Sequence, residues 1–215
     1  RVKVFQKPRA VVFSTGDEVL PLDTQDLPPG KVRDINSYTL SSHLIQRGFD
    51  VSRFPVVPDR LDALVDTSRA LLEDHDVVIL SGGSSVGARD YTLRVLESFP
   101  DAELLVHGIA IRPGKPAILA RIGSRLFWGL PGQPMSALMI CHAFVVPSLE
   151  TLEGVRQTSP WRGSRAVASA ILSRALPSVQ GRTDLFPVVI SHRETPPMAT
   201  PLFGKSAMIS ILSSA

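Results

Sequence analysis

The acidic residues best placed for chemistry lie in short loops that follow apolar runs. Asp17 and Glu18 stand in the loop STGDE, directly after the run RAVVFS at 9–14. Two adjacent carboxylates beside a phosphate site would hold a hard cation such as Mg²⁺ through oxygen ligands. Asp59 offers a third carboxylate after a second apolar run, although capping of the next helix explains it equally well. An acidic pair in a turn is usually only a solvated cap, so the metal site depends on an anion pocket beside it.

A glycine-rich loop, SGGSSVGARD, follows the cleanest strand-like run, DVVILS. Gly82 and Gly83 let the backbone approach a phosphate closely, and Ser84 and Ser85 add hydroxyl donors beside free N–H groups. The other interpretation is a tight turn that needs positive φ, and on the glycine pair alone that interpretation is favoured. Asp90 ends the loop, either as the N-cap of the following helix or as a carboxylate that faces a ligand or a divalent metal.

Two further loops combine cations with stiff backbone. In IRPGKP, Arg112 and Lys115 lie around a turn that a proline and a glycine fix. If the two cations only contacted solvent, a rigid turn would not be needed to hold them. Binding of an oxyanion is therefore the more specific interpretation. In LPGQPMS, Pro131 and Pro134 stiffen a loop whose last residues open a helix, which would aim free N–H groups and Ser136 at the same crevice. An equally good explanation is that the prolines and the glycine only end the strand and begin the helix.

The elements that position these loops alternate between strand-like runs and helical patterns. This order is typical of βαβ units and a mostly parallel sheet, in which ligands bind at the carboxyl ends of the strands. Asn36 or Ser37 can cap a helix that stops at Gly48. The runs AILARI and RLFWGL predict a hairpin, and a long helix over 135–152 should be interrupted or bent near Pro147.

Further stretches of the sequence predict another strand, another helix and a β-rich tail. The run FDVSRFPVV predicts the second strand, and residues 92–98 predict a helix with Leu93 and Leu96 facing inward. After Gly154 the sequence changes to short alternating runs with many Ser and Pro, which predict a small all-β unit. The boundary between the two parts falls near 153–160.

Composition narrows the classes of function. The chain has 215 residues, 44% hydrophobic and 20% charged, which predicts a compact fold. A net charge of +3 without a Lys/Arg run favours a small polyanionic ligand over nucleic acid. No apolar run of ~20 residues and no signal peptide is recognised, so no membrane is expected. Five histidines lack zinc-ligand spacing, and the single cysteine, Cys141, is expected to be a buried filler.

Taken in order, the loops STGDE, DINS, VPD, SGGSSVGARDYT, IRPGKP and LPGQPMSA resemble the molybdopterin molybdenumtransferases, the MoeA and gephyrin E-domain family. The resemblance covers about residues 9–154, and GRTDLF and FGKSAMISILSSA resemble the β-barrel domain that follows in that family. It implies a linker at 1–8, a molybdopterin-binding α/β domain at 9–154 and an incomplete C-terminal β-barrel at 155–215. The implied α/β domain is a MogA-like three-layer sandwich around a mostly parallel sheet.

The resemblance also implies a reaction and a set of residues. Molybdopterin-AMP and molybdate would give molybdenum cofactor and AMP with the help of Mg²⁺, in a cytoplasmic protein that is a homodimer at full length. Catalytic roles are implied for Glu18, Asp90 and Lys115. The implied metal ligands are Asp17, Glu18, Asp59 and Asp90. The residues implied to bind substrates are Gly82, Gly83, Ser84, Ser85, Arg112, Pro131, Pro134, Ser136, Arg182 and Ser206.

Two other functions stay open at this point. The chain could be a molybdopterin-binding or scaffold domain without catalysis, or an adenylyltransferase-like enzyme on the same fold. Carboxylates beside an anion pocket favour chemistry over binding alone, because like charges repel the ligand unless a cation intervenes. The β-rich tail argues against the adenylyltransferases, which in this resemblance lack a barrel.

Overall fold

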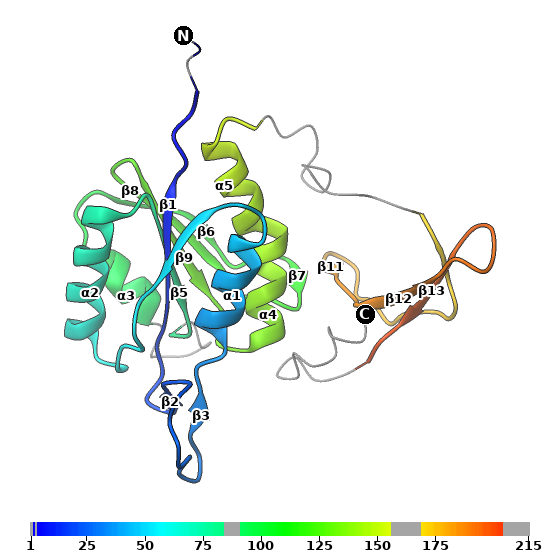
Figure 1. Ribbon diagram of the computed structural model, residues 1–215, viewed down its shortest axis with the longest axis horizontal. Helices are drawn as coiled ribbons and strands as arrows, with labels where there is room; N and C mark the ends of the chain where they lie inside the picture. Colours follow the sequence, from blue (N-terminus) through cyan, green and yellow to red (C-terminus); the bar gives the residue numbers. More distant parts are fainter. Residues whose placement is uncertain (1, 3, 84–90, 156–168, 204–215) are drawn as a thin grey trace.

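A six-stranded sheet forms the centre of the N-terminal part of the chain (Figure 1). The computed structural model describes residues 2, 4–83, 91–155 and 169–203. Four neighbouring strands run parallel, and β8 runs antiparallel to both of its neighbours. Across the sheet the strands are β4 (Asp50–Arg53), β1 (Arg9–Ser14), β5 (Val77–Ser81), β9 (Arg125–Leu130), β8 (Ile118–Ile122) and β6 (Ala102–His107).

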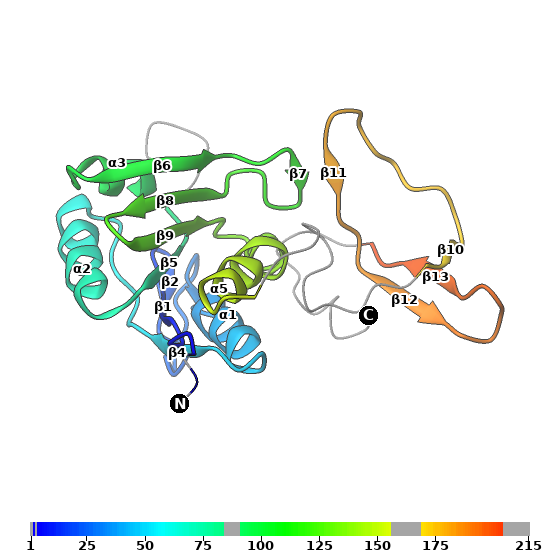
Figure 2. The same cartoon turned by 90° about the horizontal axis from the view of Figure 1, so that it is seen from above.

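Helices cover both faces of the sheet, as the second view shows (Figure 2). One face carries α1 (Asn36–Ile45), α4 (Pro134–Ile140) and α5 (Val146–Leu152), and the other carries α2 (Leu61–Asp74) and α3 (Tyr91–Glu97). Successive side chains of a strand point to opposite faces, so Ala10 and Val12 join one apolar cluster while Val11 and Phe13 join the other. This three-layer sandwich around a mostly parallel sheet confirms the predicted fold class.

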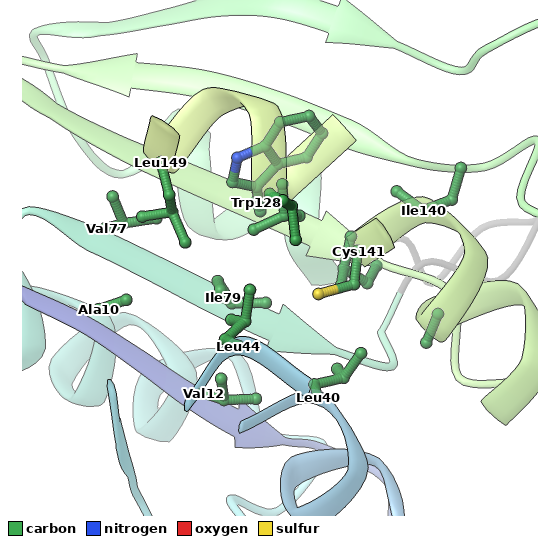
Figure 3. Packing of buried hydrophobic residues seen from close by; sticks show 14 of the residues in the cluster. Ala10, Val12, Leu40, Leu44, Val77, Ile79, Trp128, Ile140, Cys141 and Leu149 are labelled. Atoms are coloured by element: carbon green, nitrogen blue, oxygen red, sulfur yellow. The ribbon is translucent and has the colours of Figure 1, made fainter. Parts of the chain in front are cut away.

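The cluster beneath α1 and α5 shows why the central strands are continuous apolar runs. Val12 and Ile79 from the sheet pack with Leu44 and Leu149 from the helices, and all four side chains are fully buried (Figure 3). Burial of each such side chain stabilises the fold by roughly 1.5–3 kcal/mol. The strands β1 and β5 are therefore anchored from both faces, and their carboxyl ends are fixed in space.

The predicted helix caps at Asn36, Ser37 and Asp59 are wrong. Asp34 takes the capping role for α1, because its carboxylate accepts hydrogen bonds from the Ser37 backbone N–H (3.1 Å) and the Ser37 hydroxyl (2.5 Å). Asp59 does not cap α2. It accepts a hydrogen bond from the Thr15 hydroxyl instead (2.6 Å), which draws this carboxylate toward the end of β1. The glycine expected after α1, Gly48, does have the positive φ (+85°) typical of a helix end.

The second strand is shorter than predicted. β4 ends at Arg53 because Pro55 has no backbone N–H to continue the ladder. Pairing resumes beyond the proline, where the Val57 N–H donates to the Ser14 carbonyl (3.0 Å). In α3, Leu96 is buried and Leu93 is partly buried against the same apolar cluster, as expected. Thr92 and Val95 are also buried.

The long helix at the end of this part is interrupted, as predicted near Pro147. A π-helical segment, Cys141–Val145, separates α4 from α5. Proline lacks a donor for the preceding turn and its ring crowds the carbonyl four residues back, and a wider turn relieves both problems. Among the described residues, the stretch Pro134–Leu152 is long and apolar enough to span a membrane. However, 56% of its most apolar part is buried inside the protein, as in a core helix.

Several short strands were not predicted. The edge strand β6 pairs with β8, β2 (Val19–Leu20) pairs with β3 (Val32–Arg33), and β7 (Ile111–Arg112) pairs with β11 (Thr183–Asp184). The predicted β-rich tail contains a three-stranded sheet of β10 (Ile171–Leu172), β13 (Met198–Pro201) and β12 (Val188–Ser191). The β7–β11 pair joins this tail to the α/β part.

Cys141 is completely buried, and burial raises the pKa of its thiol to about 12 against the weak opposing charge of Arg47. We predict that an aromatic disulfide reagent at pH 8 reacts with the folded protein roughly a thousandfold more slowly than with the unfolded chain, because little thiolate forms. Since the folded pKa lies above the unfolded value, the stability that this thiol contributes is lost as pH rises from 9 toward 12. Equal reaction rates with and without denaturant would contradict the buried placement.

Candidate functional site

A large cleft lies at the carboxyl ends of β1, β5 and β9. Its volume is about 1790 Å³, and its walls come from both the α/β part and the C-terminal tail. The fold brings most of the predicted site residues to it: Asp17, Glu18, Asp59, Gly82, Gly83, Arg112, Lys115, Pro131, Pro134, Ser136 and Arg182. Ser84, Ser85, Asp90 and Ser206 lie outside the described residues, so their predicted roles stay predictions.

The floor of the cleft is a buried polar network that sequence reasoning missed. Asp34 accepts a hydrogen bond from the Ser14 hydroxyl at the end of β1 (2.7 Å). Asn36 donates through Nδ2 to the Ser81 hydroxyl at the end of β5 (2.8 Å) and to the Gly132 carbonyl after β9 (2.9 Å). Three strand ends are thus tied together by two side chains of the motif DINS.

The glycine pair after β5 is required by the backbone. Gly82 and Gly83 have φ values of +102° and +69°, which L side chains rarely adopt. A Cβ on Gly82 would lie 2.4 Å from the Thr15 carbonyl oxygen, so the loop passes directly against the end of β1. The tight-turn interpretation of this pair is therefore confirmed, and its phosphate-binding role stays a prediction.

The acidic side of the cleft is built around the end of β1. Asp17 Oδ1 accepts a hydrogen bond from the Asp59 backbone N–H (3.2 Å), and Asp59 Oδ1 accepts one from Thr15 Oγ1 (2.6 Å). Glu18 lines the same wall. Within the described residues, no group of three or more His, Cys, Asp or Glu side chains could hold a metal ion. The described acids thus provide neighbouring oxygen ligands rather than a complete metal cage.

The basic side of the cleft is built on the turn between β7 and β8. Arg112 and Lys115 are exposed on either side of Gly114, whose φ is +113°. A Cβ on Gly114 would lie 2.4 Å from Ile140 Cγ1, so the turn is packed tightly against α4. This packing holds two cations at the cleft on a backbone that has little freedom, as the rigid-turn interpretation predicts.

The tail adds a third cation, the predicted Arg182, and a carboxylate that was not predicted, Asp184. Arg182 Nε donates to both oxygens of Asp184 (3.0 and 3.2 Å), and Ser178 Oγ donates to Asp184 Oδ2 (2.7 Å). The Ser178 hydrogen bond, the Arg182 hydrogen bond and the charges of Arg182 and Arg112 lower the pKa of Asp184, although desolvation opposes them. Both residues belong to the motif GRTDLF, with Arg182 directly before β11 and Asp184 at its end.

The fold also joins two histidines away from the cleft. His142 Nδ1 lies 3.4 Å from His43 Nε2 and 3.1 Å from Arg47 Nη2. The sequence spacing could not reveal this pair, because it forms only when α1 packs against the helix that begins at residue 134. Neither histidine lines the cleft.

Comparisons with known proteins agree with this architecture. Residues 11–151 match the family described as "Probable molybdopterin binding domain", and residues 169–215 match the "MoeA C-terminal region (domain IV)". Molybdopterin molybdenumtransferases of Nostoc sp. and Haemophilus influenzae are 38% and 33% identical over 158 and 183 residues, which is 72% and 85% of this chain but 36% and 44% of theirs. The crystal structure of the molybdopterin biosynthesis MoeA protein from Pyrococcus horikosii superposes with a TM-score of 0.79 at 32% identity, covering 97% of this chain and 48% of that one. The chain therefore spans less than half the length of these relatives.

The close approach of Gly82 to Thr15 yields a stability test. We predict that Gly82→Ala lowers the free energy of unfolding by roughly 2–5 kcal/mol, because it adds both φ strain and a clash with backbone. Gly30→Ala is the matched control, since Gly30 also has positive φ (+79°) but nothing within 4 Å of an added Cβ. It should cost about 1 kcal/mol. Denaturant unfolding of both variants makes the comparison, and equal losses would mean that the contact at Thr15 is absent.

Proposed function

Because the chain belongs to the MoeA family, with its molybdopterin-binding domain and its C-terminal region both represented, we propose that it acts in molybdenum cofactor biosynthesis. The proposed activity is transfer of molybdenum from molybdate to adenylated molybdopterin, with release of AMP. The observation that carries the proposal is the convergence of an acidic wall and a basic wall on one cleft.

The basic wall supports binding of a tetrahedral oxyanion. Molybdate is a dianion, and it needs several donors that converge without an acid in direct contact. Arg112, Lys115 and Arg182 line the cleft from two parts of the chain, and Ser136 adds a hydroxyl at the start of α4. The roles of Pro131 and Pro134 are to shape the loop that presents this serine.

The acidic wall supports a divalent cation at the adenylate. Mg²⁺ usually keeps several waters and needs only one or two protein carboxylates together with substrate phosphates. The neighbouring Asp17 and Asp59, with Glu18 on the same wall, fit that requirement, and Asp90 would complete the set. A cation bound there would neutralise charge on the phosphate and ease departure of AMP. The proposed role of Gly82, Gly83, Ser84 and Ser85 is to hold the phosphate of the pterin.

The proposal also covers the location, the oligomeric state and the partners of the full-length protein. We propose that the full-length protein is a cytoplasmic homodimer that binds neither nucleic acid nor membrane. The match of residues 169–215 to the MoeA C-terminal region favours molybdenum insertion over an adenylyltransferase-like reaction. The acidic wall favours catalysis over binding alone, because a pure oxyanion binder gains nothing from carboxylates in its cleft.

Removal of one basic side chain should weaken molybdate binding. We predict that Lys115→Ala and Arg182→Ala each lower the affinity roughly 10-fold or more, as expected for loss of one charge-assisted hydrogen bond. Lys7→Ala removes an exposed lysine that bonds to Gly48 outside the cleft, and it should leave the affinity unchanged. Isothermal titration of each variant with molybdate gives the dissociation constants. Equal affinities for all four proteins would refute the oxyanion site.

Removal of the acidic side chains should affect turnover rather than oxyanion binding. We predict that Glu18→Gln and Asp90→Asn, in the full-length protein with Mg²⁺, lower molybdate-dependent AMP release from molybdopterin-AMP by roughly 100-fold or more. Molybdate affinity should change little in both variants. If the unsubstituted protein binds both substrates but releases no AMP, the binding-only function is correct instead.

A further inference from the structure

Asp184 is a charged side chain that the proposed reaction does not use. Its side chain is only 4% exposed, although the residue borders a cleft whose proposed ligands are anions. A carboxylate in that place repels an oxyanion and also loses hydration, so its presence needs an explanation. The proposed oxyanion site of Arg112, Lys115, Arg182 and Ser136 gives it no role.

We propose that Asp184 is a positioning residue for oxyanion binding, which holds Arg182 by its Nε so that both Nη amino groups are left to the ligand. The proposal rests on the proposed function, because it assumes that the basic wall binds molybdate. In this role Asp184 would not itself contact the molybdate.

The hydrogen bonds around Asp184 support this role. Oδ1 accepts from Arg182 Nε at 3.0 Å, and Oδ2 accepts from Ser178 Oγ at 2.7 Å and from the same Nε at 3.2 Å. Both oxygens are therefore directed at protein donors, and the buried carboxylate offers little surface to a ligand. Ser178 fixes the carboxylate, and the carboxylate in turn fixes the arginine.

The guanidinium keeps most of its donors after this bond. Arginine has five N–H groups in a planar fork, and only the single Nε–H is used by Asp184. In the part of the chain that the structure describes, no hydrogen bond of the Arg182 Nη atoms is found. The side chain is 30% exposed and lines the cleft. An arginine whose plane is already fixed loses less conformational entropy when it binds a ligand.

The strand pairing places this unit beside the other arginine of the cleft. In the β7–β11 ladder Asp184 stands opposite Arg112. The Leu185 N–H donates to the Arg112 carbonyl at 2.7 Å, and the Thr183 N–H donates to the Ala110 carbonyl at 2.8 Å. The charge of Arg112 contributes to the lowered pKa of Asp184, which agrees with this proximity. The carboxylate is thus bonded to one cation and close enough to feel the charge of the other, and its own charge offsets their mutual repulsion.

Two effects of the carboxylate oppose each other, and their balance is measurable. Its charge weakens attraction for an anion in the cleft, whereas its hydrogen bond to Arg182 strengthens binding by fixing the donors. The positive charges of Arg182 and Arg112 beside the carboxylate offset the first effect, so we expect the second to dominate. Asp184→Asn keeps the shape and removes the charge, and the sign of the change in molybdate affinity shows which effect is larger.

The expected result is a roughly 5- to 10-fold loss of molybdate affinity in Asp184→Asn, and a smaller loss in Ser178→Ala, which keeps the charge. In the Arg182→Ala background, Asp184→Asn should cause no further loss, because its effect passes through that arginine. A gain in affinity, or a full additional loss in the Arg182→Ala background, would overturn the proposal. Titration calorimetry with molybdate at fixed ionic strength supplies all five values.

A spectroscopic measurement separates positioning from a general loss of structure. With ¹⁵N-arginine labelling, the Arg182 Nε–H resonance, assigned by its absence in Arg182→Ala, should exchange slowly with water in the unsubstituted protein. It should exchange fast in Asp184→Asn, while the melting temperature stays close to the original. Rapid exchange in both proteins would also overturn the proposal. If the unsubstituted protein binds no molybdate, the proposed function fails, whereas unchanged binding in Asp184→Asn removes only the role of Asp184.

Discussion

The cleft depends on the hydrogen bonds that Asp34 and Asn36 make beneath it. A buried carboxylate and a buried amide are costly unless their hydrogen bonds are made. Here the Asp34 carboxylate and Asn36 Nδ2 bond to the ends of β1 and β5 and to the loop after β9, whereas Asn36 Oδ1 has no partner among the described residues. Adjacent strands in a parallel sheet are held along their lengths, but their ends diverge into separate loops. The two side chains join these ends, so the acidic wall and the glycine turn keep a fixed separation.

The hydrophobic layers make this arrangement possible. Because β1 and β5 are buried on both faces, they cannot slip in register without moving apolar side chains to the wrong cluster. The ends of these strands therefore fall at one height, and the loops after them meet. The cleft lies at that edge, and helices cover both faces of the sheet. The basic wall is different, since it depends on one tight turn against α4 and on a tail that pairs with β7.

Much of this could be predicted from the sequence because the signals are local. Apolar runs marked β1 and β5, the proline pattern marked the break in the long helix, and the loop motifs marked most residues of the cleft. Contacts between distant segments could not be predicted from one sequence. Asp59 reads as a cap locally, yet it bonds to Thr15, 44 residues earlier in the chain. The position of Asp184 beside the cleft depends on the pairing of β11 with β7, which the sequence does not predict. The role of Asp34 depends in the same way on its hydrogen bond with the distant Ser14.

The joint between β7 and β11 has a consequence for the energetics of the whole chain. Among the described residues it includes the β7–β11 ladder, the backbone hydrogen bonds of Thr183 to Ala110 and of Leu185 to Arg112, and the packing of Leu185 against the core. Local opening of a contact of this kind generally requires less free energy than global unfolding. A ligand that touches both Arg112 and Arg182 binds only the attached arrangement fully, so by linkage its occupancy draws the tail onto the α/β layers. A ligand bound to both arginines would therefore stabilise the attachment of the C-terminal tail to the α/β part.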